Sequence, residues 1–489
     1  MNNSCIKKIG CVFMIFLISV LIVGSIYVNI TLAGSNFESI MYYSTCAGDA
    51  NWEPLFIALK ICIPIVIVLS IVIFTILYDI TFGRKKFKYY PFSFIHKYRK
   101  FLIIGLFVFS IFMVGQCVKI YDYLFSNMSK SDIIEKEYVD PKKTKITFPE
   151  KKKNLIVITV ESLENTLFTK EKNGIWEYEV IPELSKLLSD DDGITFNNKK
   201  GMYMLHGSSY TTGSIVANSS AVPIKVGFKR FGYDKNNYMS GSYALGDLLD
   251  KEGYTNEVIS GAATSFGGLD LFYKQHGNYN IIDPTTLGEY NYKMSKNDYG
   301  NWGFNDNYLF ELAKKRLDVL ESSGKPFNLE LVTIDTHFVD GFVSDYSESK
   351  FSRQYENAYA TTSRLINDFI LYVKSKPYYE NTSIVIMGDH LTMQSNFIND
   401  SMFNDRTVYF CIIDSEDREY RHDRTYTALD TYPTIVSVLN GSIEGNRLGL
   451  GTNLFSSEKT LAEVYGVKKL DKELRKKSLF YDKMILSER

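Results

Sequence analysis

Acidic and imidazole side chains follow three separate strand-like runs of the sequence. They are Glu161 after NLIVITV, Asp335 and His337 after FNLELVTI, and Asp389 and His390 after TSIVIMG. A carboxylate in this position is also a common helix N-cap, and a single histidine is often a satisfied core residue. The combination is more specific, because a divalent metal needs oxygen and imidazole ligands that converge from different elements. The pattern therefore predicts a divalent metal site.

A second segment offers a nucleophile for such a metal. Residues 202–225, MYMLHGSSYTTGSIVANSSAVPIK, are rich in hydroxyl-bearing and small residues. The stretch around Thr211 and Thr212 could form a turn that opens onto a helix, and free amides at a helix N-terminus suit a tetrahedral anion. A hydroxyl there could be ionised by a metal and attack a phosphate or sulfate ester. The alternative is a plain loop with a capping hydroxyl.

The elements that must position these groups form an alternating pattern. Short β-branched runs lie at 154–160, 256–261, 327–334, 382–387 and 406–413, separated by helix-like segments such as 243–253, 305–324 and 356–375. Continuous apolar strands alternating with amphipathic helices predict an α/β domain with a mostly parallel sheet covered by helices on both faces. In such sheets ligands bind at the carboxyl ends of the strands, where the candidate ligands fall.

The first quarter of the chain has a different character. Three long apolar runs contain no charge, at 9–33, 61–78 and 101–118, and they predict transmembrane helices at about 9–33, 56–81 and 101–120. The alternative for the first is a cleaved signal peptide, since lysines precede it and small residues follow. We expect a membrane anchor over 1–120, a linker over 121–153 and a catalytic domain over 154–489.

Basic residues indicate the orientation of the anchor. Seven fall between the second and third stretches, namely Arg84, Lys85, Lys86, Lys88, Lys97, Arg99 and Lys100, whereas residues 34–54 contain none. By the positive-inside rule the basic loop is cytoplasmic, so the large domain faces the periplasm or the cell exterior from a multi-pass position in the cell (inner) membrane. The net charge of −1 gives no support to broad nucleic-acid binding.

Five motifs in order carry a resemblance to a known family. VITVESLENT, GSSYTTGSIVANSSAVP, DTHFVDGFVS, VIMGDHL and LDTYPTIVSVLN with LGLGTNLF together resemble the sulfatase-like, alkaline-phosphatase-superfamily domain of membrane phosphoglycerol transferases. The phosphoglycerol transferase I group is the nearer likeness and the lipoteichoic acid synthases a more distant one. The resemblance covers roughly 150–456.

The resemblance implies a role for each matching residue. Glu161, Thr211, Asp389 and His390 would be metal ligands, with Thr211 also the nucleophile. The neighbouring Thr212 remains the alternative nucleophile. His337 would bind the substrate phosphate or protonate the leaving oxygen. The metal implied is manganese, with magnesium or zinc as alternatives. The activity implied is transfer of glycerol phosphate from phosphatidylglycerol, the phospholipid donor, to a cell-envelope glycan through a phospho-threonine.

The chain also departs from the family pattern. Asn218 to Ala221 stand near the position of the usual Gln-Cys-Gly. The glycerol-binding Trp and Arg of the synthases cannot be mapped onto this chain, and the segment 265–277 offers Asp270 and His276 instead. Asp335 could complete a second metal site.

Three other functions remain open. Phosphoethanolamine transfer uses the same fold, but those enzymes bring several cysteines to the outer domain and this chain has only Cys411 there. A sulfatase or phosphodiesterase-type hydrolase is a second, although the sulfatase Cys/Ser-x-Pro-x-Arg string is missing near 208–225. A metal-free binding module is the third.

Overall fold

The computed structural model divides the chain into two compact units. One comprises Met1–Phe37 with Ala50–Leu124, and the other Glu38–Asp49 with Phe125–Arg489. The residues described are 3–31, 37–45, 53–78, 90–188, 193–198, 201–228, 232–347, 349–398, 402 and 405–487. The basic residues Arg84 to Lys88, on which the predicted orientation partly rests, lie outside them.

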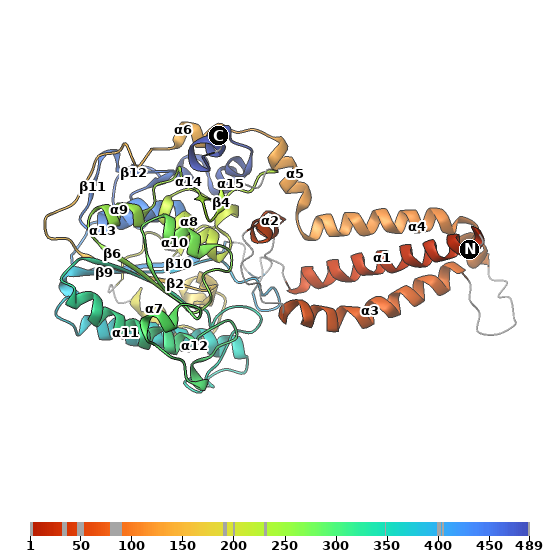
Figure 1. Ribbon diagram of the computed structural model, residues 1–489, viewed down its shortest axis with the longest axis horizontal. Coiled ribbons are helices and arrows are strands. Elements are labelled where there is room, and N and C mark those ends of the chain that lie inside the picture. The colour runs from red at the N-terminus through yellow and green to blue at the C-terminus, as the bar shows by residue number, and fades with distance from the viewer. Residues whose placement is uncertain are drawn as a thin grey trace. The chain divides into compact units, whose positions relative to one another are not determined.

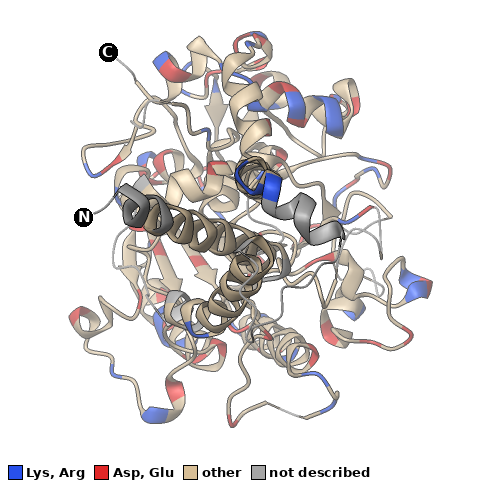
Figure 2. Ribbon diagram, turned by 90° about the vertical axis from the view of Figure 1, so that its right-hand side faces the viewer, with Lys and Arg blue, Asp and Glu red and all other residues tan. Residues whose placement is uncertain are grey.

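The first unit contains three long apolar helices, as the sequence predicts. They are α1 (Asn3–Thr31), α3 (Glu53–Tyr78) and α4 (Tyr90–Cys117). Each carries a stretch long and apolar enough to cross a membrane, at Ile9–Asn29, Ala58–Leu77 and Lys97–Cys117. Figure 2 shows the described parts of these helices almost free of charged colouring, apart from blue in α4. Many of their large apolar side chains are exposed, as expected of surfaces that face lipid.

The second unit is built on a seven-stranded sheet. Its order is β3-β10-β9-β2-β8-β6-β7, and the five strands from β9 to β7 are parallel. β10 runs antiparallel to both β9 and β3. The strands are β2 (Asn154–Val160), β3 (Gly201–Met202), β6 (Thr255–Ser260), β7 (Asn280–Ile282), β8 (Phe327–Val332), β9 (Thr382–Gly388) and β10 (Val408–Ile413). The mostly parallel sheet predicted from the sequence is confirmed.

Helices cover both faces of this sheet (Figure 1). One face carries α7 (Pro182–Leu187), α11 (Asp306–Ser322) and α12 (Gln354–Lys374); the other carries α8 (Thr211–Ser220), α9 (Leu245–Lys251), α10 (Leu269–Gln275) and α13 (Thr431–Val438). Strand residues alternate between the two cores. In β2, Leu155 and Val157 join the core of α8, whereas Ile156, Ile158 and Val160 join that of α11. This alternation explains why the strand reads as an unbroken apolar run.

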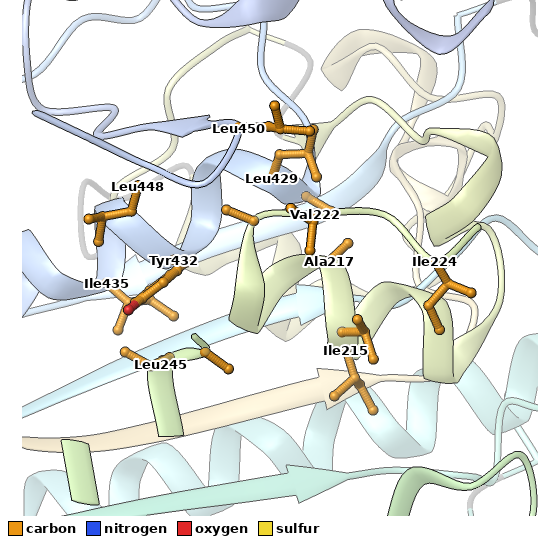
Figure 3. Close-up of a cluster of buried hydrophobic side chains, with 14 of the residues drawn as sticks. Ile215, Ala217, Val222, Ile224, Leu245, Leu429, Tyr432, Ile435, Leu448 and Leu450 are labelled. Atoms are coloured by element: carbon orange, nitrogen blue, oxygen red, sulfur yellow. The ribbon is translucent and has the colours of Figure 1, made fainter. Parts of the chain in front are cut away.

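The core beneath α8 fixes the helix that carries the candidate nucleophile. Figure 3 shows Ile215 and Ala217 of α8 in one cluster of buried hydrophobic side chains that also includes Leu245, Tyr432 and Ile435. Every residue of α8 after Thr211 is buried. A helix held this firmly gives its first turn a defined position.

Smaller elements complete the second unit. The segment predicted as a linker contains part of α5 (Ile120–Met128), α6 (Ile133–Glu137) and β1 (Ile146–Thr147), which pairs with β11 (Ser442–Ile443). Two further hairpins join β4 (Tyr233–Asp234) to β5 (Asn237–Tyr238) and β12 (Arg447–Leu448) to β13 (Gly451–Thr452). The helices α14 (Leu461–Tyr465) and α15 (Val467–Arg475) follow, and α2 (Phe37–Thr45) also belongs here except for its first residue.

Candidate active site

Neighbouring strands bring three of the predicted ligands together. Glu161 follows β2, and Asp389 and His390 follow β9, which lies beside β2 in the sheet. Their ligand atoms all lie within 4.8 Å of one another, and all three side chains are buried. His390 Nε2 lies 3.3 Å from Glu161 Oε1 and 3.5 Å from Asp389 Oδ2. The arrangement offers two carboxylates and one imidazole to a single point.

The charges of this cluster favour a bound cation. Burial and the neighbouring Glu161 carboxylate raise the pKa of Asp389 to about 7. Burial works against the charged form of His390, but the two carboxylates outweigh it and raise the pKa of its imidazole. Asp389 Oδ2 is buried without a hydrogen-bond partner. A divalent cation would satisfy that oxygen and offset the mutual repulsion of the carboxylates, so the donor set fits a metal ion.

Ser162 holds the two carboxylates in place. Its backbone amide donates to Asp389 Oδ1 at 2.7 Å, and its hydroxyl donates to Glu161 Oε1 at 2.7 Å. Tyr359 in turn donates to the carbonyl of Ser162 at 3.0 Å. Ser162 has a φ of 55°, which is unusual for a residue other than glycine. The sharp turn after β2 is therefore built to link both carboxylates.

Thr211 lies at the start of α8 beside this cluster. Its hydroxyl is 3.3 Å from Glu161 Oε2, and it is the first residue of the helix. The first amides of a helix have no intrahelical acceptor and can bind an anion. Gly213 permits the close packing here, because a Cβ would lie 2.7 Å from the Gly207 carbonyl. Thr212 points elsewhere, toward Gly267, where an added Cβ would lie 2.8 Å from its Oγ1.

His337 comes from the loop after β8, the other neighbour of β2. Its Nδ1 is 2.6 Å from the Phe338 carbonyl, which assigns the proton to Nδ1 and leaves Nε2 as an acceptor. Burial lowers the pKa of this imidazole to about 4, and the charge of His390 adds to the effect. Trp302 packs against the ring at a centroid distance of 4.6 Å. His337 is therefore a neutral, oriented imidazole.

A cavity of about 650 Å³ opens next to the His337 loop. Its lining includes residues directly after His337 and residues of the loop that follows His390, namely Val339, Asp340, Gly341, Gln394, Asn396 and Phe397. Asn301, Arg353, Gln354 and Tyr355 complete it. Amide, guanidinium and aromatic side chains thus line one cavity beside the candidate site.

Asp335 lies apart from the candidate metal group. Its Oδ2 accepts a hydrogen bond from the Asp306 amide at 2.9 Å, and burial together with the Asp306 carboxylate raises the pKa of Asp335 well above its usual value. Among the described residues, the only group of three potential ligands with metal-like geometry is Glu161, Asp389 and His390. The raised pKa thus favours a retained proton over a second metal at Asp335.

His276 and Asp270, the two alternative substrate-binding residues, make contacts outside the candidate site. His276 is buried between Asp247 Oδ2, at 2.9 Å from its Nδ1, and the Tyr238 carbonyl, at 2.7 Å from its Nε2. Asp270 pairs with Lys274 on the surface of α10. His276 therefore ties α10 to the β4–β5 hairpin.

Sequence reasoning missed two residues that contact the site. Ser162 directly follows Glu161, and a hydroxyl adjacent to a candidate ligand was the available signal. Trp302 carries no such signal, because it lies 35 positions before His337 and meets it only through the fold.

A family match decides the identity of this domain. The profile that matches residues 153–442, more than half of the chain, is described as Sulfatase. The chain belongs to the sulfatase family. The resemblance expected from the five motifs is thereby confirmed, and the candidate ligands of this sulfatase-family chain fall inside the matched region.

Curated relatives refine the placement. Phosphoglycerol transferase I of Salmonella choleraesuis and that of Escherichia coli are each 30% identical over 338 residues, covering 67% of this chain and 42% of theirs. The sulfatase-family chain thus matches less than half the length of these relatives.

Solved structures agree on the fold. An alkaline-phosphatase-superfamily protein from Vibrio parahaemolyticus has a TM-score of 0.52 at 20% identity, covering 68% of this chain and 79% of that one. A lipoteichoic acid synthase from Listeria monocytogenes has a TM-score of 0.50 at 17% identity, covering 66% and 81%. These likenesses confirm an alkaline-phosphatase-like α/β domain.

Proposed function

We propose that this protein transfers glycerol phosphate from phosphatidylglycerol to a hydroxyl of a cell-envelope glycan through a phospho-threonine at Thr211. The observation that carries the proposal is the position of the Thr211 hydroxyl, 3.3 Å from a ligand of the buried carboxylate–imidazole cluster and at the N-terminus of α8. The likeness to phosphoglycerol transferase I supports this choice of group.

Four residues would hold the metal: Glu161, Thr211, Asp389 and His390. A divalent cation there, manganese by family resemblance, lowers the pKa of the Thr211 hydroxyl and offsets phosphoryl charge when bound. The first amides of α8 orient the phosphoryl oxygens. Ser162 keeps Glu161 and Asp389 from separating through its two hydrogen bonds.

The transfer proceeds in two displacements at phosphorus. Thr211 Oγ loses its proton to His337 Nε2 or to water and forms a bond to the phosphorus. The bond to the diacylglycerol oxygen breaks as that oxygen takes a proton from the now protonated His337 or from water. In the second displacement, the glycan hydroxyl loses its proton and attacks the phospho-threonine, and Thr211 Oγ leaves and regains a proton. His337 Nε2, unprotonated in its resting form, can take the proton of the attacking hydroxyl.

The surroundings support a lipid donor and a glycan acceptor. Three candidate membrane spans in the same chain would keep the domain at a bilayer, where a phospholipid can reach Thr211. The orientation that places the domain outside the cytoplasm, and the division into anchor (1–120), linker (121–153) and catalytic domain (154–489), are part of this proposal. The cavity beside His337 has room and polar groups for a sugar.

The test uses the full-length protein in detergent with its metal. Phosphatidylglycerol and phosphatidylethanolamine, each labelled in the head group, are supplied separately, and the adduct on the 202–225 peptide is identified by mass spectrometry. We expect a glycerol phosphate adduct on Thr211 and none in Thr211→Ala, whose activity should fall by about 10⁴-fold. The matched control is Ser209→Ala, since the Ser209 hydroxyl bonds the His206 carbonyl. Full activity of Thr211→Ala, or an ethanolamine phosphate adduct alone, would contradict the proposal.

A further inference from the structure

The helix α2 connects two membrane spans in sequence but folds with the large domain. It lies between α1 and α3 along the chain, and residues Glu38 onward cluster with residues 125–489. Nine residues form a marginal helix by themselves. Its contacts with the large domain must therefore hold it, and these contacts converge on the segment that carries Thr211.

Glu38 ties the start of α2 to both flanks of α8. Its Oε1 accepts a hydrogen bond from the Val226 amide at 2.9 Å, after the helix, and its Oε2 lies 3.3 Å from His206 Nε2, before the helix. Both side chains of the Glu38–His206 pair are nearly buried. One carboxylate thus spans the entry to and the exit from the helix with the candidate nucleophile.

Tyr42, one turn after Glu38, is buried in the core of the large domain. It is fully buried, and its hydroxyl donates to the Gly267 carbonyl at 2.6 Å. The same oxygen meets the Tyr238 hydroxyl, which must then be the donor of that bond. The Tyr42 ring packs on Tyr210 at a centroid distance of 5.5 Å. Tyr210 is the N-cap residue of α8 and directly precedes Thr211.

Tyr43 covers the same turn from its outer side. Its ring lies 5.5 Å from that of Tyr210 and stacks on Phe266 at 5.1 Å and 22°. Gly267 separates it from α8, because a Cβ there would meet both Tyr43 Cε1 and Thr212 Oγ1 at 2.8 Å. The buried Tyr210 hydroxyl has no hydrogen-bond partner, so ring packing is what holds this side chain.

We propose that α2 is a positioning element of the active site, whose Glu38, Tyr42 and Tyr43 fix the Tyr210–Thr211 turn against the carboxylate–imidazole cluster. This role rests on the proposed function only for the assignment of Thr211 as nucleophile. The site is then completed by the loop between the first two membrane spans, and residues 125–489 alone leave Tyr210, Tyr238 and Phe266 uncovered. Misplacing a nucleophile by about 1 Å can cost about 10²-fold in rate.

The main variant is Tyr43→Ala in the full-length protein, because Tyr43 is only partly buried and its loss should not prevent folding. A matched control exists in Tyr178→Ala, since Tyr178 stacks on Phe351 at 5.3 Å and 20°. Hydrogen exchange of residues 206–214 is measured together with kcat and KM for the labelled lipid. We expect Tyr43→Ala to raise exchange in this segment by about tenfold and to lower kcat by about tenfold at an unchanged KM.

Two further variants guard the interpretation. Tyr43→Phe keeps the ring and should leave both exchange and kcat closer to the wild-type values than Tyr43→Ala does. Glu38→Gln keeps the shape of the side chain but removes the charge facing His206, and should raise exchange at residues 206–214 more mildly. Tyr178→Ala should leave that segment unchanged.

Two outcomes would overturn the inference. One is wild-type exchange at residues 206–214 in Tyr43→Ala; the other is an equal rise in β2 and β9, which would make α2 a general stabiliser. If the wild-type protein labels Thr211 from neither lipid, the proposed function fails. The exchange pattern still decides the role of α2 in that case.

Discussion

Two buried acidic clusters lie at the carboxyl edge of the same sheet, and their surroundings give them opposite chemistry. In the first, Glu161 and Asp389 face the imidazole of His390. Each cluster has one buried carboxylate oxygen without a hydrogen-bond partner, Asp389 Oδ2 in the first and Asp335 Oδ1 in the second. In the second, Asp306 Oδ1 accepts from the amides of Ile334 and Asp335, and its Oδ2 accepts from Thr362 at 2.8 Å.

The comparison shows how neighbours decide what a buried carboxylate does. Both pairs suffer repulsion and desolvation. In the Asp306–Asp335 pair, backbone amides, a hydroxyl and a retained proton offset the repulsion and the cost of desolvation. The Glu161–Asp389 pair has an imidazole and the Thr211 hydroxyl beside it, so a cation can replace the proton. Carboxylates at a strand end thus become a metal centre only when other ligands converge on them.

The largest expected difference between the two clusters is their contribution to the affinity for a metal ion. Asp389→Asn should weaken binding of Mn²⁺ by about 100-fold or more, because a first-sphere anionic ligand is lost, whereas Asp335→Asn should leave it unchanged. Isothermal titration of the full-length protein with Mn²⁺ measures both. Equal losses in the two variants would place Asp335 in the metal site and end the distinction.

The second-largest effect is expected from the hydrogen bonds that hold these carboxylates in place. Ser162→Ala removes the hydrogen bond to Glu161 Oε1 and should lower Mn²⁺ affinity by about tenfold. Thr362→Ala removes the matching hydroxyl from Asp306, and should lower stability by about 1 kcal/mol without affecting Mn²⁺. Titration and thermal unfolding of both variants distinguish the two effects, and unchanged Mn²⁺ affinity in Ser162→Ala would remove Ser162 from its assigned role.

The pH dependence of metal binding follows from Asp389. Its pKa of about 7 in the metal-free protein means that a proton must leave as the cation binds. Mn²⁺ affinity should therefore rise several-fold as the pH increases from 6 to 8, and the protein should release protons on binding. Titrations in buffers of different ionisation enthalpy count those protons, and a flat affinity profile would contradict the assignment.

The smallest effect concerns Asp335 and stability. Its pKa is raised by folding, so the folded state holds the proton more tightly than the unfolded state and loses stability as the pH rises above the usual carboxyl range. Asp335→Asn keeps an oxygen for the Asp306 amide but has no proton to lose. From pH 5 to pH 8 the variant should lose less stability than the wild type, by on the order of 1 kcal/mol. Unfolding temperatures of both proteins across this range test it.

Much of the fold was predictable because its signals are local. Each of the five strand-like runs is a strand of the sheet, and the helices at 243–253, 305–324 and 356–375 correspond to α9, α11 and α12 within a few residues. Unbroken apolar runs require a sheet buried on both faces, and this requirement is visible without any long-range contact. The antiparallel direction of β10 left no mark in the sequence, since its residues are equally apolar in either direction.

The sequence by itself determined which groups could do the chemistry and near which strand ends they stand. Residue type and strand order are properties of the chain, and parallel strands end at one edge. Only the tertiary structure decided the rest. It separated Asp335 from the cluster, turned His276 into a structural residue and brought Trp302 to His337. It also laid α2, far away in sequence, against Tyr210. These contacts join side chains that are far apart in the sequence, and short-range periodicity does not indicate them.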